Sequence, residues 1–356
     1  MDKMLYRDII FLNKNYVFVK GDIKTQGDIV TEICEKEATG CFSKAVIPPF
    51  VDIHIHGGFG VDIMSVESSE IMYLSKRLYK DNVGAYLPST VAKSYDEILK
   101  CGERVKTAAL KQSENGNKEY AEILGIHIEG PFISKKYKGI MEEKYITDCE
   151  FKLYEDLKEI MGDLKIRFTI APDCKGAEEF CKYVTENGDL VSIGHSNAAY
   201  EECRSMEKAG ASSYTHLFNA MSPLHHREIG TVGAGLMSEK YTELICDNVH
   251  ISKPCIELTA KLRADKIILI TDAMEAMGSE NGSYVFCGKR VTAYNGFVKD
   301  ENGTLAGSVL TMKKAVENMA EITGYEKAVK MAAENPAKLL KLKKYGYIDI
   351  GKRIII

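Results

Sequence analysis

The sequence predicts an α/β protein: a (β/α)8 TIM-like barrel with a small β-sandwich domain built from the N- and C-terminal segments. Three observations lead to this prediction. Short apolar runs alternate with charged, helix-like stretches of about ten to twenty residues. Hydrophobic residues make up 45% of the 356 residues, which is enough for a large core. Polar residues gather at the ends of the apolar runs, where a barrel exposes its strand ends to ligands.

The first residues predict a small β unit. Two alternating segments, Tyr16–Val19 and Ile29–Ile33, are typical of strands. Glycines interrupt this region at Gly21, Gly27 and Gly40. The last residues, Tyr347–Ile356, are expected to return to this unit as a strand. We therefore expect residues 1–48 and 345–356 to form the small domain, and residues 49–344 to form the barrel.

Eight apolar runs predict the barrel strands: Val46–His54, Gly84–Pro88, Glu122–Glu129, Ile166–Ala171, Leu190–Ile193, Ser213–His216, Thr242–Cys246 and Lys266–Thr271. Helix-like segments lie between them, among them Ser68–Asp81, Tyr95–Lys111, Ala177–Asn187, Ala199–Ala209 and Lys253–Arg263. A doubly wound open sheet is the rival architecture, but no GxGxxG opens a helix after the first strand. A Gly-rich stretch, residues 278–307, should contain a hairpin, Tyr284–Val291, and two helices should follow, Leu310–Ile322 and Tyr325–Leu340.

A pair of histidines ends the first barrel strand. His54 and His56 are two residues apart, so on a strand they share one face and can bind one metal ion. Glu129, His195 and His216 follow three other strands and form a second candidate set, with positions left open for water. The histidine pair could hold a second ion, with Glu129 or Asp272 shared between the two ions. Asp272, after the eighth strand, is the expected general base.

Several other polar residues have a simpler interpretation. His127 shares a face with Glu129, but we favour a structural role for it. His225 and His226 fall in a loop, where solvated side chains are as plausible as functional ones. Asp247 could simply cap the next helix. The ten cysteines are scattered, include no CxxC and show no nucleophile signature, which favours reduced thiols in the cytoplasm.

Charge and hydropathy exclude some classes of protein. The net charge is −4 and charges of both signs are mixed along the chain, so we expect no nucleic-acid or membrane surface. No apolar run reaches the length of a membrane span, and the N-terminal MDKMLYRDII lacks the apolar stretch of a signal peptide. A cytoplasmic protein with a small-molecule substrate is expected.

Six motifs resemble those of a known family. They are PPFVDIHIHGG (48–58), GIHIEGPF (125–132), IGHSNA (193–198), THLFNAMSPLHHREIG (215–230), TDAMEAMG (271–278) and GTLAGS (303–308). Through them the chain resembles the N-acetylglucosamine-6-phosphate deacetylases of the amidohydrolase superfamily over about residues 45–345. The fourth and sixth motifs are the most specific.

The resemblance implies a metal-dependent homodimer that removes acetate from N-acetylglucosamine 6-phosphate in amino-sugar catabolism or cell-wall recycling. It implies one or two divalent ions, zinc or iron. Glu129, His195, His216, His54 and His56 would be metal ligands and Asp272 the catalytic acid/base. The implied substrate-binding residues are Ile140, Met141, Asn219, Ala220, Arg227, His250, Leu305, Ala306 and Gly307. Arg227 suits a phosphate physically, because its guanidinium donates two parallel hydrogen bonds.

Three departures from the family pattern keep alternatives open. The usual KGAH reads Lys138-Gly-Ile-Met141, so a side chain that cannot donate a hydrogen bond replaces the histidine. The usual REPG reads Arg227-Glu-Ile-Gly230, and the short ending GKRIII predicts a trimmed β domain. Met141 motivates a different substrate, such as N-acetylgalactosamine 6-phosphate. A weakly active sugar-phosphate-binding paralogue is a third possibility, against which the intact Asp272 argues.

Overall fold

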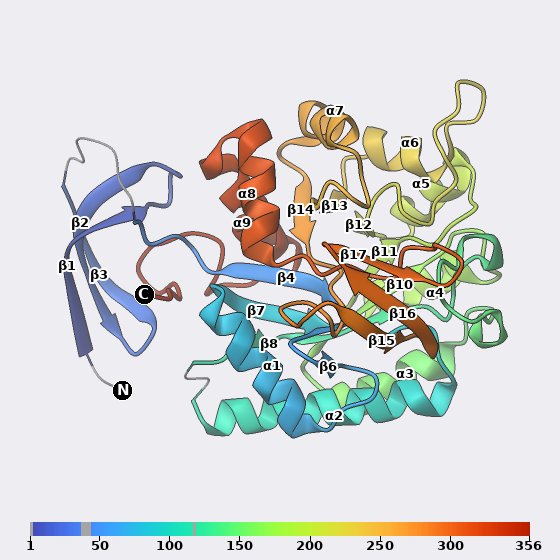
Figure 1. Cartoon of the computed structure of the whole chain (residues 1–356), viewed down its shortest axis with the longest axis horizontal. Coiled ribbons are helices and arrows are strands. Elements are labelled where there is room, and N and C mark those ends of the chain that lie inside the picture. The colour runs from blue at the N-terminus through green and yellow to red at the C-terminus, as the bar shows by residue number, and fades with distance from the viewer. Residues whose placement is uncertain (1–2, 37–43, 117–118) are drawn as a thin grey trace.

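A computed structural model describes residues 3–36, 44–116 and 119–356. The N-terminal sheet is antiparallel and contains β1 (Lys3–Leu12), β2 (Phe18–Gln26) and β3 (Ile29–Lys36). It lies at one end of the molecule beside both termini, and the barrel lies at the other end (Figure 1). Gly40, which was expected to interrupt this unit, lies outside the described residues.

The C-terminal segment packs on the N-terminal sheet as irregular chain. It pairs with the sheet at single bridges, Ile348 with Asn13 and Arg353 with Ile29, so the predicted strand Tyr347–Ile356 is wrong. A turn at Asp349 interrupts it, and Gly351 has φ +81° there. The two layers enclose a small apolar core made of Phe11, Ile23, Val30, Ile348 and Ile354. The expected return of the C-terminus is confirmed, although a strand does not make it.

Eight strand positions curl into the barrel. The strands are β4 (Phe50–Ile55), β7 (Val83–Pro88), β9 (Gly125–Glu129) with the short β8 (Glu122–Ile123) before it, β10 (Lys165–Ile170), β11 (Leu190–Ile193), β12 (Ser213–Tyr214), β13 (Tyr241–Ile245) and β14 (Ile267–Ile270). They form two parallel sheets, ordered β4-β7-β8 and β14-β13-β12-β11-β10-β9. Their edges meet through Asp272 N–H donating to the His54 carbonyl at 2.9 Å and Thr90 N–H donating to the His127 carbonyl at 2.8 Å. The predicted barrel is confirmed.

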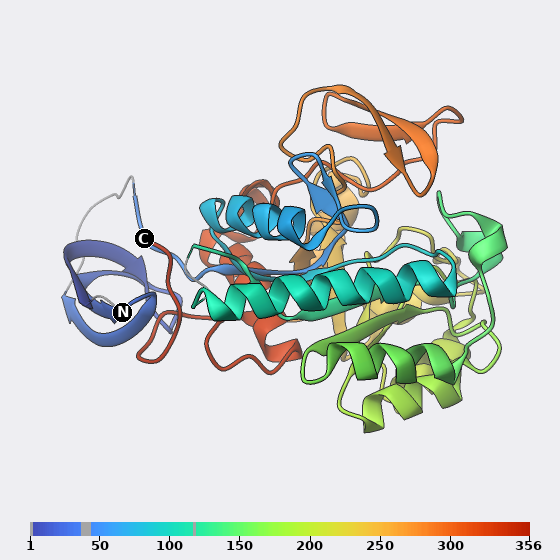
Figure 2. The same ribbon diagram turned by 90° about the horizontal axis from the view of Figure 1, so that it is seen from below.

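Helices alternate with the strands and cover the outside of the barrel (Figures 1 and 2). They are α1 (Ser68–Lys80), α2 (Tyr95–Glu114), α3 (Phe151–Met161), α4 (Ala177–Glu186), α5 (Tyr200–Lys208), α6 (Gly230–Met237), α7 (Lys253–Arg263), α8 (Met312–Thr323) and α9 (Tyr325–Leu339). In α2, the Ser94 hydroxyl caps the first turn by accepting from Glu97 N–H. Its inward residues, Ile98, Cys101 and Val105, recur every three or four positions and are buried.

A second small sheet covers part of the barrel's mouth. It contains β15 (Gly282–Phe286), β16 (Lys289–Tyr294) and β17 (Phe297–Asp300), which confirms and extends the predicted hairpin. Cys287 and Gly288 have φ +52° and +78°, as a two-residue hairpin turn requires. The sheet stands beside the short strands β5 (Gly57–Gly58) and β6 (Val61–Asp62) in Figure 2. Its inner side packs on an apolar cluster that includes Met141.

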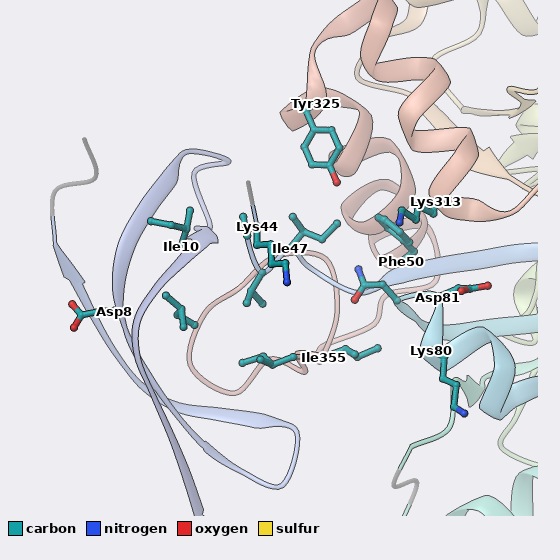
Figure 3. A pocket seen from close by; sticks show the side chains of 15 residues that line it. Asp8, Ile10, Lys44, Ile47, Phe50, Lys80, Asp81, Lys313, Tyr325 and Ile355 are labelled. Atoms are coloured by element: carbon teal, nitrogen blue, oxygen red, sulfur yellow. The ribbon is translucent and has the colours of Figure 1, made fainter. Parts of the chain in front are cut away.

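A cavity of about 610 Å³ separates the N-terminal sheet from the barrel (Figure 3). Ile9 and Ile10 line one side of it, and Phe50 and Tyr325 line the other. Phe50 begins β4, so this cavity lies at the opposite end of that strand from the two histidines. No helix in the described part of the chain combines the length and apolarity needed to cross a membrane.

Candidate metal centre

Six buried side chains converge at the carboxyl ends of the barrel strands. One triad consists of His54 and His56, at the end of β4, with Asp272, which follows β14. The second triad consists of Glu129 from the end of β9 with His195 and His216 from the segments that follow β11 and β12. In a parallel barrel these strand ends open onto one face, so residues far apart in sequence are brought together.

Distances within the first triad are short. The Nε2 atoms of His54 and His56 are 3.1 Å apart, so the two rings share a face as their spacing predicts. Asp272 Oδ1 lies 3.3 Å from His54 Nε2 and 3.1 Å from His56 Nε2. Three possible ligand atoms therefore surround one point.

The second triad has the same form, and Glu129 joins the two. Glu129 Oε1 lies 3.2 Å from His195 Nε2 and 3.0 Å from His216 Nε2, and these nitrogens are 3.2 Å apart. The same oxygen is 3.3 Å from His54 Nε2, while Oε2 is 3.3 Å from His56 Nε2. One carboxylate thus reaches both sets, as a bridging ligand does.

These atoms fit divalent metal ions. Tetrahedral zinc with bonds of about 2.0–2.1 Å to nitrogen needs ligand atoms about 3.3 Å apart, which is close to every separation above. Imidazole nitrogens and carboxylate oxygens also suit iron. All six side chains are buried. Without an ion, their carboxylates and imidazoles would face one another as charged groups shielded from water, and such burial is costly.

The charges within the cluster set its protonation. Burial works against charge at His54, yet the negative charges of Glu129 and Asp272 outweigh it and raise its pKa well above the usual value. Burial would raise the pKa of Asp272, but the neighbouring histidines lower it to about 2. A metal ion replaces the protons on the imidazoles, so its binding is expected to weaken as pH falls.

Two ligand rings have a partner for their outer nitrogen. His195 Nδ1 lies 2.7 Å from the Tyr137 carbonyl oxygen, so Nδ1–H donates a hydrogen bond to that oxygen. His54 Nδ1 lies 3.5 Å from Glu243 Oε2. His127 packs edge-on against His54, and hydroxyls of Ser89 and Thr169 satisfy both its nitrogens, at 2.9 and 2.8 Å. This agrees with the structural role expected of His127.

A cavity of about 620 Å³ opens over the triads. Most of the predicted substrate-binding residues line it: Ile140, Met141, Asn219, Ala220, His250, Leu305 and Gly307. Ala306 is fully buried and is not among the lining residues. Arg227 is exposed and lies with His225 and His226 in a neighbouring cavity of about 750 Å³, where it bonds to His226. Within one chain, therefore, Arg227 does not reach the cavity of the triads.

Asp247 has a different role from the helix cap that the sequence suggested. Ser252 is the N-cap of α7. Asp247 Oδ1 instead accepts from the N–H groups of Val249 and His250, at 2.8 Å each, and Oδ2 lies 2.7 Å from His250 Nδ1. Burial works to lower the pKa of His250, but Asp247 outweighs it, so this pKa lies above its usual value. Asp247 thus favours the protonated form of His250 at the cavity wall.

Several lining residues were not predicted from the sequence. Lys136, Tyr137, Lys138 and Gly139 come from the loop after β9, Gly303 and Thr304 precede Leu305, and Phe286 and Cys287 form the tip of the β15–β16 hairpin. The Phe286 ring meets His56 edge-on at 5.4 Å between centroids. The glycine-rich stretch predicted a hairpin, but no sequence signal shows that its tip reaches the barrel's mouth.

Comparison with known proteins supports the resemblance. The sequence pattern of the amidohydrolase family matches residues 45–354. An N-acetylglucosamine-6-phosphate deacetylase of Bacillus subtilis is 33% identical, over 99% of this chain and 91% of its own length. An N-acetylgalactosamine-6-phosphate deacetylase of Escherichia coli O157:H7 is 32% identical, over 91% of this chain and 85% of its own.

A solved structure supports the fold. A variant N-acetyl-D-glucosamine-6-phosphate deacetylase of Mycobacterium smegmatis, in complex with N-acetyl-D-glucosamine-6-phosphate, superposes with a TM-score of 0.88 at 25% identity. The superposition covers 99% of this chain and 94% of that one. The architecture is therefore shared over the whole molecule, including the small domain.

Proposed function

Because the chain belongs to the amidohydrolase family, we propose that it hydrolyses the acetamide of N-acetylglucosamine 6-phosphate, giving glucosamine 6-phosphate and acetate. The observation that supports this most is the convergence of two ligand triads in one cavity at the strand ends. The triads suit amide hydrolysis, and a sugar phosphate could fill the adjoining cavities. Amino-sugar catabolism or cell-wall recycling would use this reaction.

When bound, a divalent ion such as zinc or iron polarises a carbonyl oxygen and makes water more acidic. Glu129, His195 and His216 would hold one ion, and His54 and His56 would help to hold a second. Each of these side chains is buried, which excludes competing ligands from the solvent.

Asp272 is proposed as the proton carrier. Its carboxylate belongs to the first triad and borders the cavity, with 12% of the side chain exposed. It takes a proton from the water that attacks the acetyl carbon. It then gives that proton to the amine nitrogen as the carbon–nitrogen bond breaks, which balances the hydrolysis.

The cavity offers polar groups for the sugar and its phosphate. Asn219 and His250 lie on its wall, and Lys136 and Tyr137 border both this cavity and the neighbouring one that contains Arg227. We propose that the phosphate extends toward the second cavity, where lysine and arginine side chains would neutralise it.

A second candidate substrate is N-acetylgalactosamine 6-phosphate. Met141 favours it, because this buried side chain lines the cavity and cannot donate a hydrogen bond to the substrate. A relative named for that activity is almost as similar as those named for the glucosamine epimer.

Acetate release from a matched panel tests these proposals. The panel contains both epimers as 6-phosphates and both as free sugars. We expect the highest kcat/KM with N-acetylglucosamine 6-phosphate and a large loss without phosphate. A preference for the galactosamine epimer would favour the second candidate, and no release from any of the four would contradict a deacetylase.

A further inference from the structure

A buried ion pair lies inside the barrel beneath the triads. Arg167 on β10 and Glu243 on β13 are both fully buried, and an Arg167 amino group donates to Glu243 Oε1. Arg167 also donates to the Ser213 hydroxyl at 3.2 Å. Charges are rarely buried so completely unless a partner compensates them, so this pair needs an explanation.

The second oxygen of Glu243 reaches both triads. Oε2 lies 3.5 Å from the ring nitrogen Nδ1 of His54, and it accepts a hydrogen bond from the backbone N–H of His216 at 3.3 Å. Arg167 occupies Oε1, so Oε2 remains directed at these two ligands. The ion pair therefore fixes the direction of the carboxylate as well as its charge.

The partners of the ligand rings differ. Among the described residues, His56 Nδ1 and His216 Nδ1 have no hydrogen-bond partner, whereas His54 and His195 each have one. Metal-binding histidines usually donate their outer N–H to a carboxylate or a carbonyl, which orients the ring and raises its basicity. The first triad has one such anchor, and it is Glu243.

We propose that Glu243, held by Arg167, is a positioning residue that presents His54 Nε2 to an ion in the His54–His56–Asp272 triad. This inference rests on the proposed function only in requiring that the triads bind metal. The second triad keeps its own anchor, the Tyr137 carbonyl, so loss of Glu243 should weaken chiefly the ion held by His54.

Two double variants isolate this role. Glu243→Gln with Arg167→Met leaves an amide oxygen that can accept from His54 Nδ1, and Glu243→Met with Arg167→Met leaves only a thioether sulfur, which is a weak acceptor. Both remove the buried cation, so neither leaves an unpaired charge. Asp189→Asn is the matched control, because Asp189 is a buried carboxylate paired with Lys158, at the start of β11 and away from the triads.

The measurement is the number and affinity of bound zinc ions in metal-buffered solution, counted by mass spectrometry without any substrate. We expect two ions in the natural protein and in Asp189→Asn. The Met variant should bind the second ion about 10–100-fold more weakly than the Gln variant, with the first ion little changed.

Equal affinities in the two double variants would overturn the proposal, and so would a single ion in the natural protein. Failure of both variants to fold would assign the ion pair to stability and would also contradict it. None of these results depends on acetate release, so they are separate from the test of the proposed function.

Discussion

Three of the six side chains in the triads sit on strained backbone. His195, His216 and Asp272 have φ of +47°, +29° and +48°, in a region that residues with a side chain seldom adopt. Such strain costs about 1–3 kcal/mol for each residue and persists where function requires a particular side-chain direction. Each of the three residues lies two positions beyond the end of its strand, where the turn of the backbone directs its side chain into the cavity.

Asp272→Asn tests the proton carrier. The amide keeps the size of the side chain but cannot take a proton from water, so kcat should fall by at least about a hundredfold. Metal content at the Glu129 triad should stay, since Asp272 is not part of it. The check is kcat at matched metal content, and a kcat close to that of the natural protein would assign the proton transfer to another group.

Asp247→Asn tests the charge on His250. Asp247 raises the pKa of His250, so protonated His250 persists to a higher pH than usual. If this cation helps to bind the anionic substrate, binding is strong below that pKa and weakens as pH rises through it. The variant lowers the pKa, so the rise of KM with pH should begin at a lower pH. Profiles of KM against pH that coincide for the two proteins would remove His250 from substrate binding.

At the scale of elements, the strand pattern was predictable because apolar runs bounded by glycines and charges suit a barrel buried on both faces. The strand Leu190–Ile193 is found as predicted. The strand expected over Ser213–His216 ends at Tyr214, because the positive φ of His216 leaves the extended conformation. The triads were likewise predictable, since each residue lies in the last two positions of a strand or within two positions after it.

Contacts that depend on the closed barrel could not be predicted. Arg167 lies between apolar residues of β10, and Glu243 is the one charge of β13. Only the curvature of the sheet brings the two strands together inside the barrel. The reach of Phe286 depends on the path between β14 and α8, which local sequence does not determine. The turn at Asp349 replaces a predicted strand. Gly351 is the sequence signal that indicates this turn.

The loop between β12 and α6 carries Arg227, and Arg227→Ala tests its part in phosphate binding. The guanidinium is exposed and bonds to its neighbour His226, so its loss should leave the fold intact. A lost charged hydrogen bond is worth roughly 1.5–3 kcal/mol. KM should therefore rise at least about tenfold for the phosphorylated sugar and little for the free sugar. Equal rises for both would exclude a contact with phosphate.

At the scale of the molecule, an apolar face suggests self-association. Met237 at the end of α6 and Leu258 and Leu262 on the neighbouring α7 are about half exposed, at 60%, 47% and 58%. Leu224, in the loop that carries Arg227, is also exposed. Exposed apolar side chains on neighbouring elements are typical of protein interfaces. We expect a homodimer through this face.

Light scattering tests the dimer. The natural protein should have twice the mass of one chain, and Met237→Glu with Leu262→Glu should give the mass of one chain with an unchanged circular dichroism spectrum. Lys261→Glu on the same helix is a control for added charge. A dimer that survives both glutamates would place the interface elsewhere.

The most direct test of the central claim is metal-dependent acetate release. The protein is stripped with a chelator at low pH, where protonation of the imidazoles favours release of the ions, and zinc or iron is then returned. The account predicts that the stripped protein stays folded and inactive on N-acetylglucosamine 6-phosphate, and that activity returns as up to two ions bind per chain. Full activity in the stripped protein, or no activity at any metal loading, would contradict it.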